Sequence, residues 1–304
     1  MKLPFFSKRK RRRPADMAAL LKQARANLAL PTAILASEPF RTLVRPVPLD
    51  PTTRRRLLVL APHQHDEALG AGGTLLMARA AGARTQVVYL TDGAEKGDES
   101  GSVAVRSKEA ADACEWLGAE RADLGLSNIR VDPTRAAVER LASLIHDFQP
   151  DALLVPWLLD GTAKHRMANH LLWLANHGSP LPATEVWGFQ VNNAFDPNAF
   201  VDITEVAEQK RKLLELYRSQ NEKLLSFDHI GMGLSAWNSK WLPKNKGSHE
   251  PRYGEIFVAV TLRDHLDLIE QHYFADLSST YLGFETIQRG MGEIHRAVTG
   301  AKVS

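Results

Sequence analysis

The sequence predicts an α/β domain in which a mainly parallel β-sheet carries helices on both faces. Apolar runs at 57–61, 86–90 and 151–155 are typical of buried strands. Helical segments of about 10–15 residues separate them, and this alternation favours parallel strands joined by crossover helices. No stretch of 18 apolar residues occurs, so no transmembrane helix is predicted.

The individual elements follow from local signals. Asp16 can cap a helix that Pro31 ends, Thr91-Asp92-Gly93 ends the second strand, and Gly118 closes a helix. A Gly/Asn/Lys-rich stretch at 231–253 indicates a loop. In chain order we expect strands at 57–61, 86–90, 122–126, 151–155, 185–191, 201–203 and 255–261, and helices near 17–30, 74–81, 104–117, 133–147, 165–176, 204–218, 263–275 and 284–298.

The positive charge is concentrated at one end of the chain. Residues 1–13 contain seven basic groups and no acid, whereas the rest has 31 basic and 35 acidic residues, a formal net of −4. A nucleic-acid surface spread over the domain is therefore not expected. The single cysteine, Cys114, excludes an internal disulfide and a cysteine-based zinc site, and suits a reducing, cytoplasmic compartment.

The N-terminal segment has three interpretations. Phe5 and Phe6 could enter a lipid interface while the basic run at 8–13 and an amphipathic helix at 17–30 face an anionic membrane. The alternative is a solvated tail whose helix packs on the domain, and a tail-directed nucleic-acid contact is a third reading. We expect residues 1–50 to form this tail and helix, and residues 51–304 to form the α/β domain with a C-terminal helical extension.

Two chemical clusters follow predicted strands. Pro62-His63-Gln64-His65-Asp66-Glu67 lies at the end of the first strand, where open α/β sheets build their sites. Lys164-His165-Arg166 follows the strand at 151–155, which commonly lies beside the first. His63, Asp66 and His165 could then meet, and two imidazoles with one carboxylate and an open position make a catalytic zinc site.

Several other site patterns are excluded. His63-x-His65-Asp66 lacks the spacer and the following histidine of a metallo-β-lactamase. Gly70, Gly72 and Gly73 do not have the spacing of a dinucleotide fingerprint, and no P-loop or nucleophile elbow occurs.

The ordered motifs resemble the PIG-L/LmbE-like metal-dependent N-deacetylases over about residues 56–262. That family has Pro-His-Pro-Asp-Asp-Glu, a Gly-rich turn, Thr-Asp-Gly, an Arg-x-x-Glu helix and a late Asp-His-Arg. The counterparts here are Pro62 to Glu67, Gly70 to Gly73, Thr91 to Gly93, Arg106 to Glu109 and Lys164 to Arg166, followed by Val201 to Thr204, Lys212, Tyr217, Ser219, Gln220 and Arg252 to Phe257.

The resemblance implies a Rossmann-like three-layer α/β/α sandwich and hydrolysis of an N-acetyl group on a glucosamine-type sugar. It implies Zn²⁺ held by His63, Asp66 and His165, with Asp92 orienting a ligand and Arg106 contacting the sugar. We also expect Asn128 and Trp157 to face the substrate. Glu67 is expected to form hydrogen bonds near the site and not to bind the metal.

The chain departs from the family at the acid–base groups. His65 stands where the family has its aspartate base, Thr162 replaces a histidine that stabilises the oxyanion, and Lys164 replaces that histidine's Asp partner. A neutral His65 beside a cation can still take a proton, and Lys164 or Thr162 can donate to an oxyanion.

Three functional hypotheses follow. The first is a zinc-dependent N-deacetylase acting on an amino sugar of a glycolipid or polysaccharide precursor, cytoplasmic or peripheral at the cytoplasmic membrane face. The second is a catalytically degenerate member that binds metal or sugar in a glycan assembly complex. The third is altered chemistry on the same scaffold. The stretch 231–253, with Trp237 and Trp241, could be a substrate lid or a membrane contact.

Overall fold

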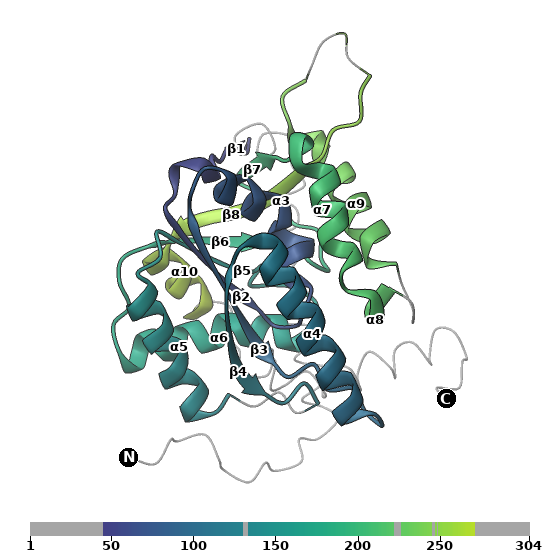
Figure 1. Cartoon of the computed structure of the whole chain (residues 1–304). Helices are drawn as coiled ribbons and strands as arrows, with labels where there is room; N and C mark the ends of the chain where they lie inside the picture. The colour runs from purple at the N-terminus through teal and green to yellow at the C-terminus, as the bar shows by residue number, and fades with distance from the viewer. Residues whose placement is uncertain (1–44, 130–132, 222–225, 245–246, 248, 271–304) are drawn as a thin grey trace, which may run out of the picture. The chain divides into compact units, whose positions relative to one another are not determined.

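The computed structural model describes residues 45–129, 133–221, 226–244, 247 and 249–270 (Figure 1). The strands are β1 (Val47–Pro48), β2 (Arg56–Ala61), β3 (Arg84–Thr91), β4 (Glu120–Leu126), β5 (Ala152–Pro156), β6 (Glu185–Phe189), β7 (Ala199–Asp202) and β8 (Gly254–Thr261). The α-helices are α3 (Asp66–Ala80), α4 (Glu99–Leu117), α5 (Arg135–Phe148), α6 (Ala163–Gly178), α7 (Ala207–Glu215), α8 (Arg218–Asn221), α9 (Phe227–Asn238) and α10 (Leu262–Ile269). Short 3₁₀ turns are η1 (Pro51–Thr53), η2 (Thr204–Val206) and η3 (Ser239–Trp241).

The described strands form one sheet in the order β1-β7-β8-β6-β5-β2-β3-β4. Every pairing is parallel except those of β8, which is antiparallel to both β6 and β7. The predicted neighbourhood of the first strand and the 151–155 strand is confirmed, because Leu57 to Val59 of β2 pair with Ala152 to Leu154 of β5. β1 joins the sheet through β7, so residues assigned to the N-terminal segment already belong to the folded sheet.

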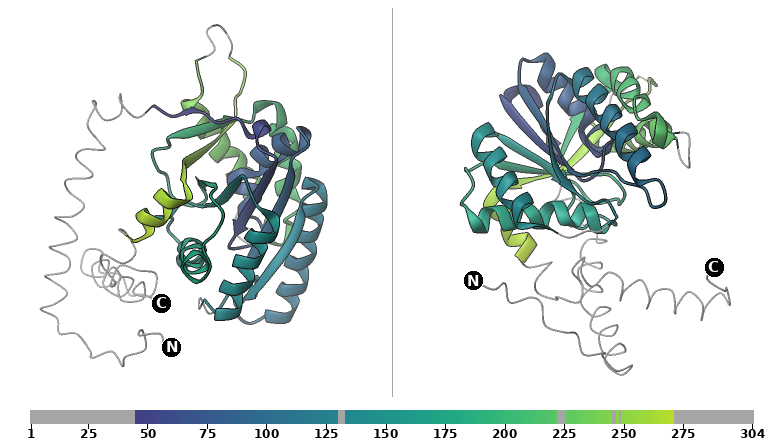
Figure 2. Two further views of the ribbon diagram at one scale, coloured as in Figure 1. Left: turned by 90° about the vertical axis from the view of Figure 1, so that its left-hand side faces the viewer. Right: turned by 60° about the horizontal axis from the view of Figure 1, so that its bottom comes forward.

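Alternate residues of β2 point into two separate cores. Leu57 and Val59 pack with α3, α4, α7 and α9, whereas Leu58 and Leu60 pack with α5 and α6. Figure 2 shows these helix groups on opposite faces of the sheet. A strand that is buried on both faces must be apolar at every position, which explains the continuous run at 57–61. The predicted α/β/α sandwich is confirmed.

The first helix begins earlier than predicted. It starts at Asp66 and not near residue 74, and the three glycines lie inside it. A Cβ on Gly70 would stand 2.1 Å from the Phe189 ring, and one on Gly73 would stand 2.7 Å from Ile203. The glycines therefore let α3 lie close to β6 and to the segment after β7, and they do not form a turn.

The prediction of a loop over 231–253 is wrong for its first part, where α9 continues to Asn238 and η3 follows. Tertiary packing overrides the weak helix propensity of its glycines. Gly231 lies against Leu69 and Leu214, and Ser235 accepts a hydrogen bond from the buried Lys210 ammonium. That ammonium also contacts Glu255 at 2.6 Å, which ties α7, α9 and β8 together.

Several sequence predictions lie outside the described residues. These are the basic run, the helix at 17–30, the helix at 284–298 and the end of the helix at 263–275. In the described part of the chain, no helix has the length and apolar character needed to cross a membrane.

The docking of α10 on α6 predicts acid-sensitive stability. His265 is buried, its Nε2 lies 2.8 Å from Asn169 Oδ1, and burial lowers its pKa to about 4. The unfolded chain therefore binds the proton first as pH falls below about 6.5, and the native state loses about 3 kcal/mol by pH ~4 from this group. The free energy of unfolding, measured with urea, should fall between neutral pH and pH ~5 in both proteins. The fall should be about 2 kcal/mol smaller in His265→Gln than in the parent protein.

The exposed His229 provides the matched control, since His229→Gln should keep the pH dependence of the parent protein. Equal pH dependence in His265→Gln and the parent would show that burial of His265 does not contribute.

Candidate functional site

The site lies at the carboxyl ends of the parallel strands. Residues 63–66 follow β2, Asp92 follows β3, and the segment 160–165 follows β5. Because β2 is flanked by β3 and β5, these segments converge at one edge of the sheet.

Asp66 is the centre of the cluster and is fully buried. Its Oδ2 lies 3.0 Å from His63 Nδ1 and 3.3 Å from His165 Nε2. The same two imidazole nitrogens lie 3.3 Å from each other. The three donor atoms therefore form a compact triangle, here called the ligand triangle, and it contains the predicted residues His63, Asp66 and His165.

The ligand triangle fits a divalent metal. Tetrahedral zinc with ligand distances near 2.0–2.1 Å has donor–donor edges of about 3.3 Å, which the observed edges of 3.0–3.3 Å match. The donor set of two imidazoles and one carboxylate leaves a fourth position free. Asp66 Oδ1 is buried and has no hydrogen-bond donor among the described residues.

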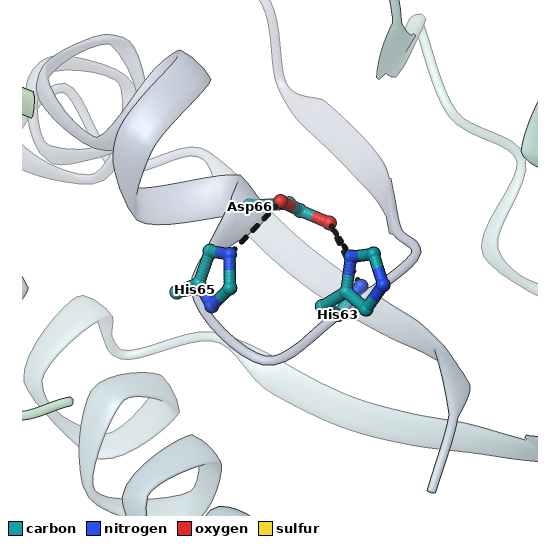
Figure 3. Close-up of side chains that lie close together, drawn as sticks. All are labelled: His63, His65 and Asp66. Atoms are coloured by element: carbon teal, nitrogen blue, oxygen red, sulfur yellow. Dashed lines mark hydrogen bonds and ion pairs between the residues drawn. The ribbon is translucent and has the colours of Figure 1, made fainter. Parts of the chain in front are cut away.

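A second grouping of donors includes His65. Ligand atoms of His63, His65 and Asp66 lie within 4.8 Å of one another (Figure 3), with His65 Nε2 3.3 Å from Asp66 Oδ1. Figure 3 shows Asp66 between the two histidines. In the ligand triangle, by comparison, every pair of donor atoms lies within 3.3 Å.

His165 is oriented by residues that the sequence analysis did not select. Its Nδ1 lies 3.0 Å from Asp160 Oδ1, so Nε2 faces the triangle. Asp160 is itself held by Asn192, whose backbone and side-chain nitrogens donate at 3.0 and 2.9 Å. This carboxylate–histidine pair is typical of metal-binding histidines. Asp160 stands five residues before His165, and this proximity in sequence could have pointed to it. Asn192 follows β6, and no sequence pattern links it to the site.

Burial and charge set the protonation of the triangle. Burial opposes ionisation of Asp66, but His165, His63 and His65 hold its pKa well below the ordinary value. Burial also disfavours a charged His165, yet Asp66 and Asp160 raise its pKa to about 10. Burial lowers the pKa of His63 to about 4. Binding a cation would therefore release a proton from His165.

His65 sits at the start of α3 in a rare backbone conformation. Its φ is 139°, which non-glycine residues seldom adopt and which costs about 1–3 kcal/mol. The ring stacks on Phe227 at 4.6 Å, and its Nδ1 contacts Gln220 Oε1. Strain of this kind is often retained where it positions a functional group.

Glu67 follows Asp66 on α3, and its side chain is fully buried. It accepts a hydrogen bond from the Tyr217 hydroxyl, and the Tyr217 and Tyr89 hydroxyls lie 3.2 Å apart. Burial raises the pKa of Glu67 to about 7. Glu67 thus ties α3 to Tyr217 through a hydrogen bond.

Thr162 and Lys164 flank His165 on α6. Thr162 is the N-cap of the helix, and its Oγ1 accepts from the His165 backbone N–H at 3.3 Å. This leaves the hydroxyl hydrogen to donate. Lys164 is half-buried; burial and the neighbouring Arg106 lower its pKa, while Asp66 and Asp92 oppose that shift. Lys164 therefore lies within the electrostatic field of the site.

Three other predicted residues form hydrogen bonds or ring contacts within the protein. Asp92 Oδ1 accepts from the backbone amides of Ala94 and Asn128 at 3.0 and 2.9 Å and contacts no member of the ligand triangle. Asn128 Nδ2 donates to the Ala94 carbonyl at 2.9 Å. The Trp157 ring packs on Phe195 at 5.2 Å.

The Arg106 guanidinium contacts two side chains of the protein itself. Its Nη2 pairs with Glu95 at 2.8 Å, and its Nη1 donates to Gln220 at 2.9 Å. Both contacts are structural, and a sugar contact by Arg106 stays a prediction.

The fold and the cluster define an α/β protein with a group of potential metal ligands at the carboxyl edge of its sheet. Residues 58–176 match the family model described as PIG-L: GlcNAc-PI de-N-acetylase. A diacetylchitobiose deacetylase of Thermococcus kodakarensis is 28% identical over an alignment of 189 residues, and the match covers 55% of this chain and 70% of that relative. The match to this family model over residues 58–176 agrees with the motifs, and the diacetylchitobiose deacetylase is a relative of the same kind.

Solved structures share the fold. The N,N'-diacetylchitobiose deacetylase of Pyrococcus horikoshii has a TM-score of 0.58 at 21% identity. The match covers 73% of this chain and 92% of the deacetylase chain. The 4-carboxy-2-hydroxymuconate hydratase of Pseudomonas putida KT2440 has a TM-score of 0.59 at 22% identity and covers 68% and 96%. Because proteins with different named reactions share this fold, the fold alone does not select the chemistry.

Proposed function

We propose that the protein is a zinc-dependent N-deacetylase that acts on an N-acetylated amino sugar of the N-acetylglucosamine type. The observation that carries this proposal is the ligand triangle, whose edges of 3.0–3.3 Å suit a divalent metal. The match of residues 58–176 to the PIG-L family model and the similarity to a diacetylchitobiose deacetylase support the substrate class. We extend the proposal to amino sugars in glycolipid or polysaccharide precursors.

The residues of the chain divide the work of amide hydrolysis. His63, Asp66 and His165 would hold the ion, which supplies Lewis acidity when it is bound. His65 Nε2 would take a proton from the attacking water as the water oxygen adds to the acetyl carbon. Lys164 and the Thr162 hydroxyl would donate to the oxyanion. The same proton then passes to the sugar nitrogen as the C–N bond breaks, leaving acetate and the free amine.

The experiment is acetate release from a panel of N-acetylglucosamine conjugates by the zinc-loaded protein. We expect acetate and free amine in equal amounts, and removal of zinc by a chelator should abolish the release. Zinc binding without any acetate release would contradict the enzyme and favour a metal- or sugar-binding member of the family. Turnover of an unsaturated acid without acetate release would favour the altered-chemistry hypothesis.

We also propose that the N-terminal basic run brings the protein to an anionic membrane surface. The seven basic groups in residues 1–13 support this, at about 1 kcal/mol for each group near the surface. The full chain should sediment with vesicles that contain anionic lipid, more weakly as salt rises, and a chain lacking residues 1–13 should not. Equal sedimentation of both chains would contradict the proposal, and binding of the tail to duplex RNA or DNA alone would favour the nucleic-acid reading.

A further inference from the structure

The Gln220 side chain has an orientation that its partners determine. Its Nε2 donates to the Gln64 backbone carbonyl at 2.7 Å, and its Oε1 accepts from Arg106 Nη1 at 2.9 Å. A backbone carbonyl can only accept and a guanidinium can only donate, so the amide oxygen and nitrogen cannot be exchanged. The atom that faces His65 Nδ1 is therefore the amide oxygen.

We propose that Gln220 is a positioning residue that holds His65 in the tautomer with its proton on Nδ1 and a lone pair on Nε2. An amide oxygen cannot donate, so the hydrogen between it and His65 must belong to the imidazole. The proposal deepens the proposed function, on which it rests, because it names the residue that prepares the His65 nitrogen facing the ligand triangle.

The Nε2 atom of His65 faces the ligand triangle. It lies 3.3 Å from Asp66 Oδ1, and no hydrogen bond joins the two atoms. With the proton on Nδ1, the lone pair of Nε2 is directed at the edge of the ligand triangle, where a base is required.

The positions of Gln220 and His65 are set independently of the bond between them. On the Gln220 side, the backbone N–H and the hydroxyl of the adjacent Ser219 donate to Glu109 of α4 at 2.6 and 2.8 Å. Arg106, also on α4, is held by Glu95. On the other side, the Phe227 ring fixes the plane of His65 by stacking at 4.6 Å. The acceptor is therefore in place before the chemistry begins, as preorganisation requires.

The two site histidines have different partners for Nδ1. Asp160 presents a carboxylate to His165, whereas Gln220 presents a neutral amide to His65. Both partners direct Nε2 toward the cluster, but only the amide does so without adding negative charge. This contrast assigns His165 to cation binding and His65 to proton transfer.

The test is the tautomer of His65, read from long-range ¹H–¹⁵N correlation spectra of ¹⁵N-histidine-labelled protein at neutral pH, with and without zinc. The His65 signals are assigned by their loss in His65→Asn. We expect a protonated Nδ1 and an unprotonated Nε2 in the parent protein. Gln220→Met should mix or invert the tautomers, and Gln220→Glu should keep them because it retains the acceptor.

Gln86→Met is the matched control, since Gln86 is a buried glutamine of β3 that contacts neither His65 nor the triangle. It should leave the His65 signals unchanged. In acetate release, Gln220→Met should lower kcat about 10- to 100-fold with KM and zinc content retained, and Gln220→Glu should recover part of the rate.

A protonated Nε2 in the parent protein, or an unchanged tautomer in Gln220→Met, would overturn the proposal. If Gln220→Met does not fold, the parent spectrum and Gln220→Glu still decide, because inversion of the tautomer in Gln220→Glu also overturns it. The spectra do not depend on activity. An Nδ1-protonated His65 in a protein that releases no acetate therefore contradicts the proposed function and supports the tautomer assignment.

Discussion

His63→Ala and His165→Ala should each lose most of their bound zinc, measured by elemental analysis after dialysis against the metal. Each change removes one corner of a triangle with edges of 3.0–3.3 Å and leaves two donors, too few to hold the ion firmly. Acetate release should fall by more than about 10²-fold, because the Lewis acidity of the ion is worth several kcal/mol.

Asp160→Asn tests the orientation of His165 without removing a donor. Zinc affinity should fall about 10- to 100-fold, the usual cost of losing the partner of a metal-binding histidine. His177→Ala is the matched control, since His177 is an exposed histidine on the same helix. Full zinc content in both His63→Ala and His165→Ala would show that the ion binds elsewhere.

His65→Ala should keep its zinc and lose about 10²–10⁴-fold in kcat/KM, the usual share of general-base catalysis. The ligand triangle does not include His65, so the metal content should separate the two roles. His65→Asp should recover part of the activity, because it places a carboxylate base at the start of α3. Aspartate is also among the non-glycine residues that tolerate positive φ best.

Different outcomes would each exclude one role of His65. Loss of zinc in His65→Ala would make His65 a ligand, as the grouping with His63 and Asp66 allows. Full activity in His65→Ala would show that another group takes the proton. Inactivity of the parent protein with a gain of activity in His65→Asp would identify a degenerate member of the family.

The central strands could be predicted from the sequence more fully than the helices. Strands such as β2 and β5 are buried on both faces, and their composition alone marks them. The segment 227–238 contains two glycines, and its helix depends on contacts with Leu69, Lys210 and Leu214 from distant parts of the chain. Propensity is local, so it could not anticipate that packing.

In the candidate site, the sequence also predicts some of the residues and leaves their contacts to the tertiary structure. His63, His65 and Asp66 lie within one short segment, so their proximity could be predicted, and His165 followed from the expected pairing of β5 with β2. Asp160 was present in the same segment as His165, but its pairing with Nδ1 depends on the rotation of the imidazole.

The sequence by itself determined the order of most strands and helices, the resemblance to the PIG-L family and the residues able to bind a metal, because burial patterns and dense motifs are local properties. Only the tertiary structure decided which nitrogen of each histidine faces the cluster. The partners that settle this, Asp160 and Gln220, reach the imidazoles through hydrogen bonds of fixed direction. Gln220 stands 155 residues from His65 in the chain, and no local pattern connects them.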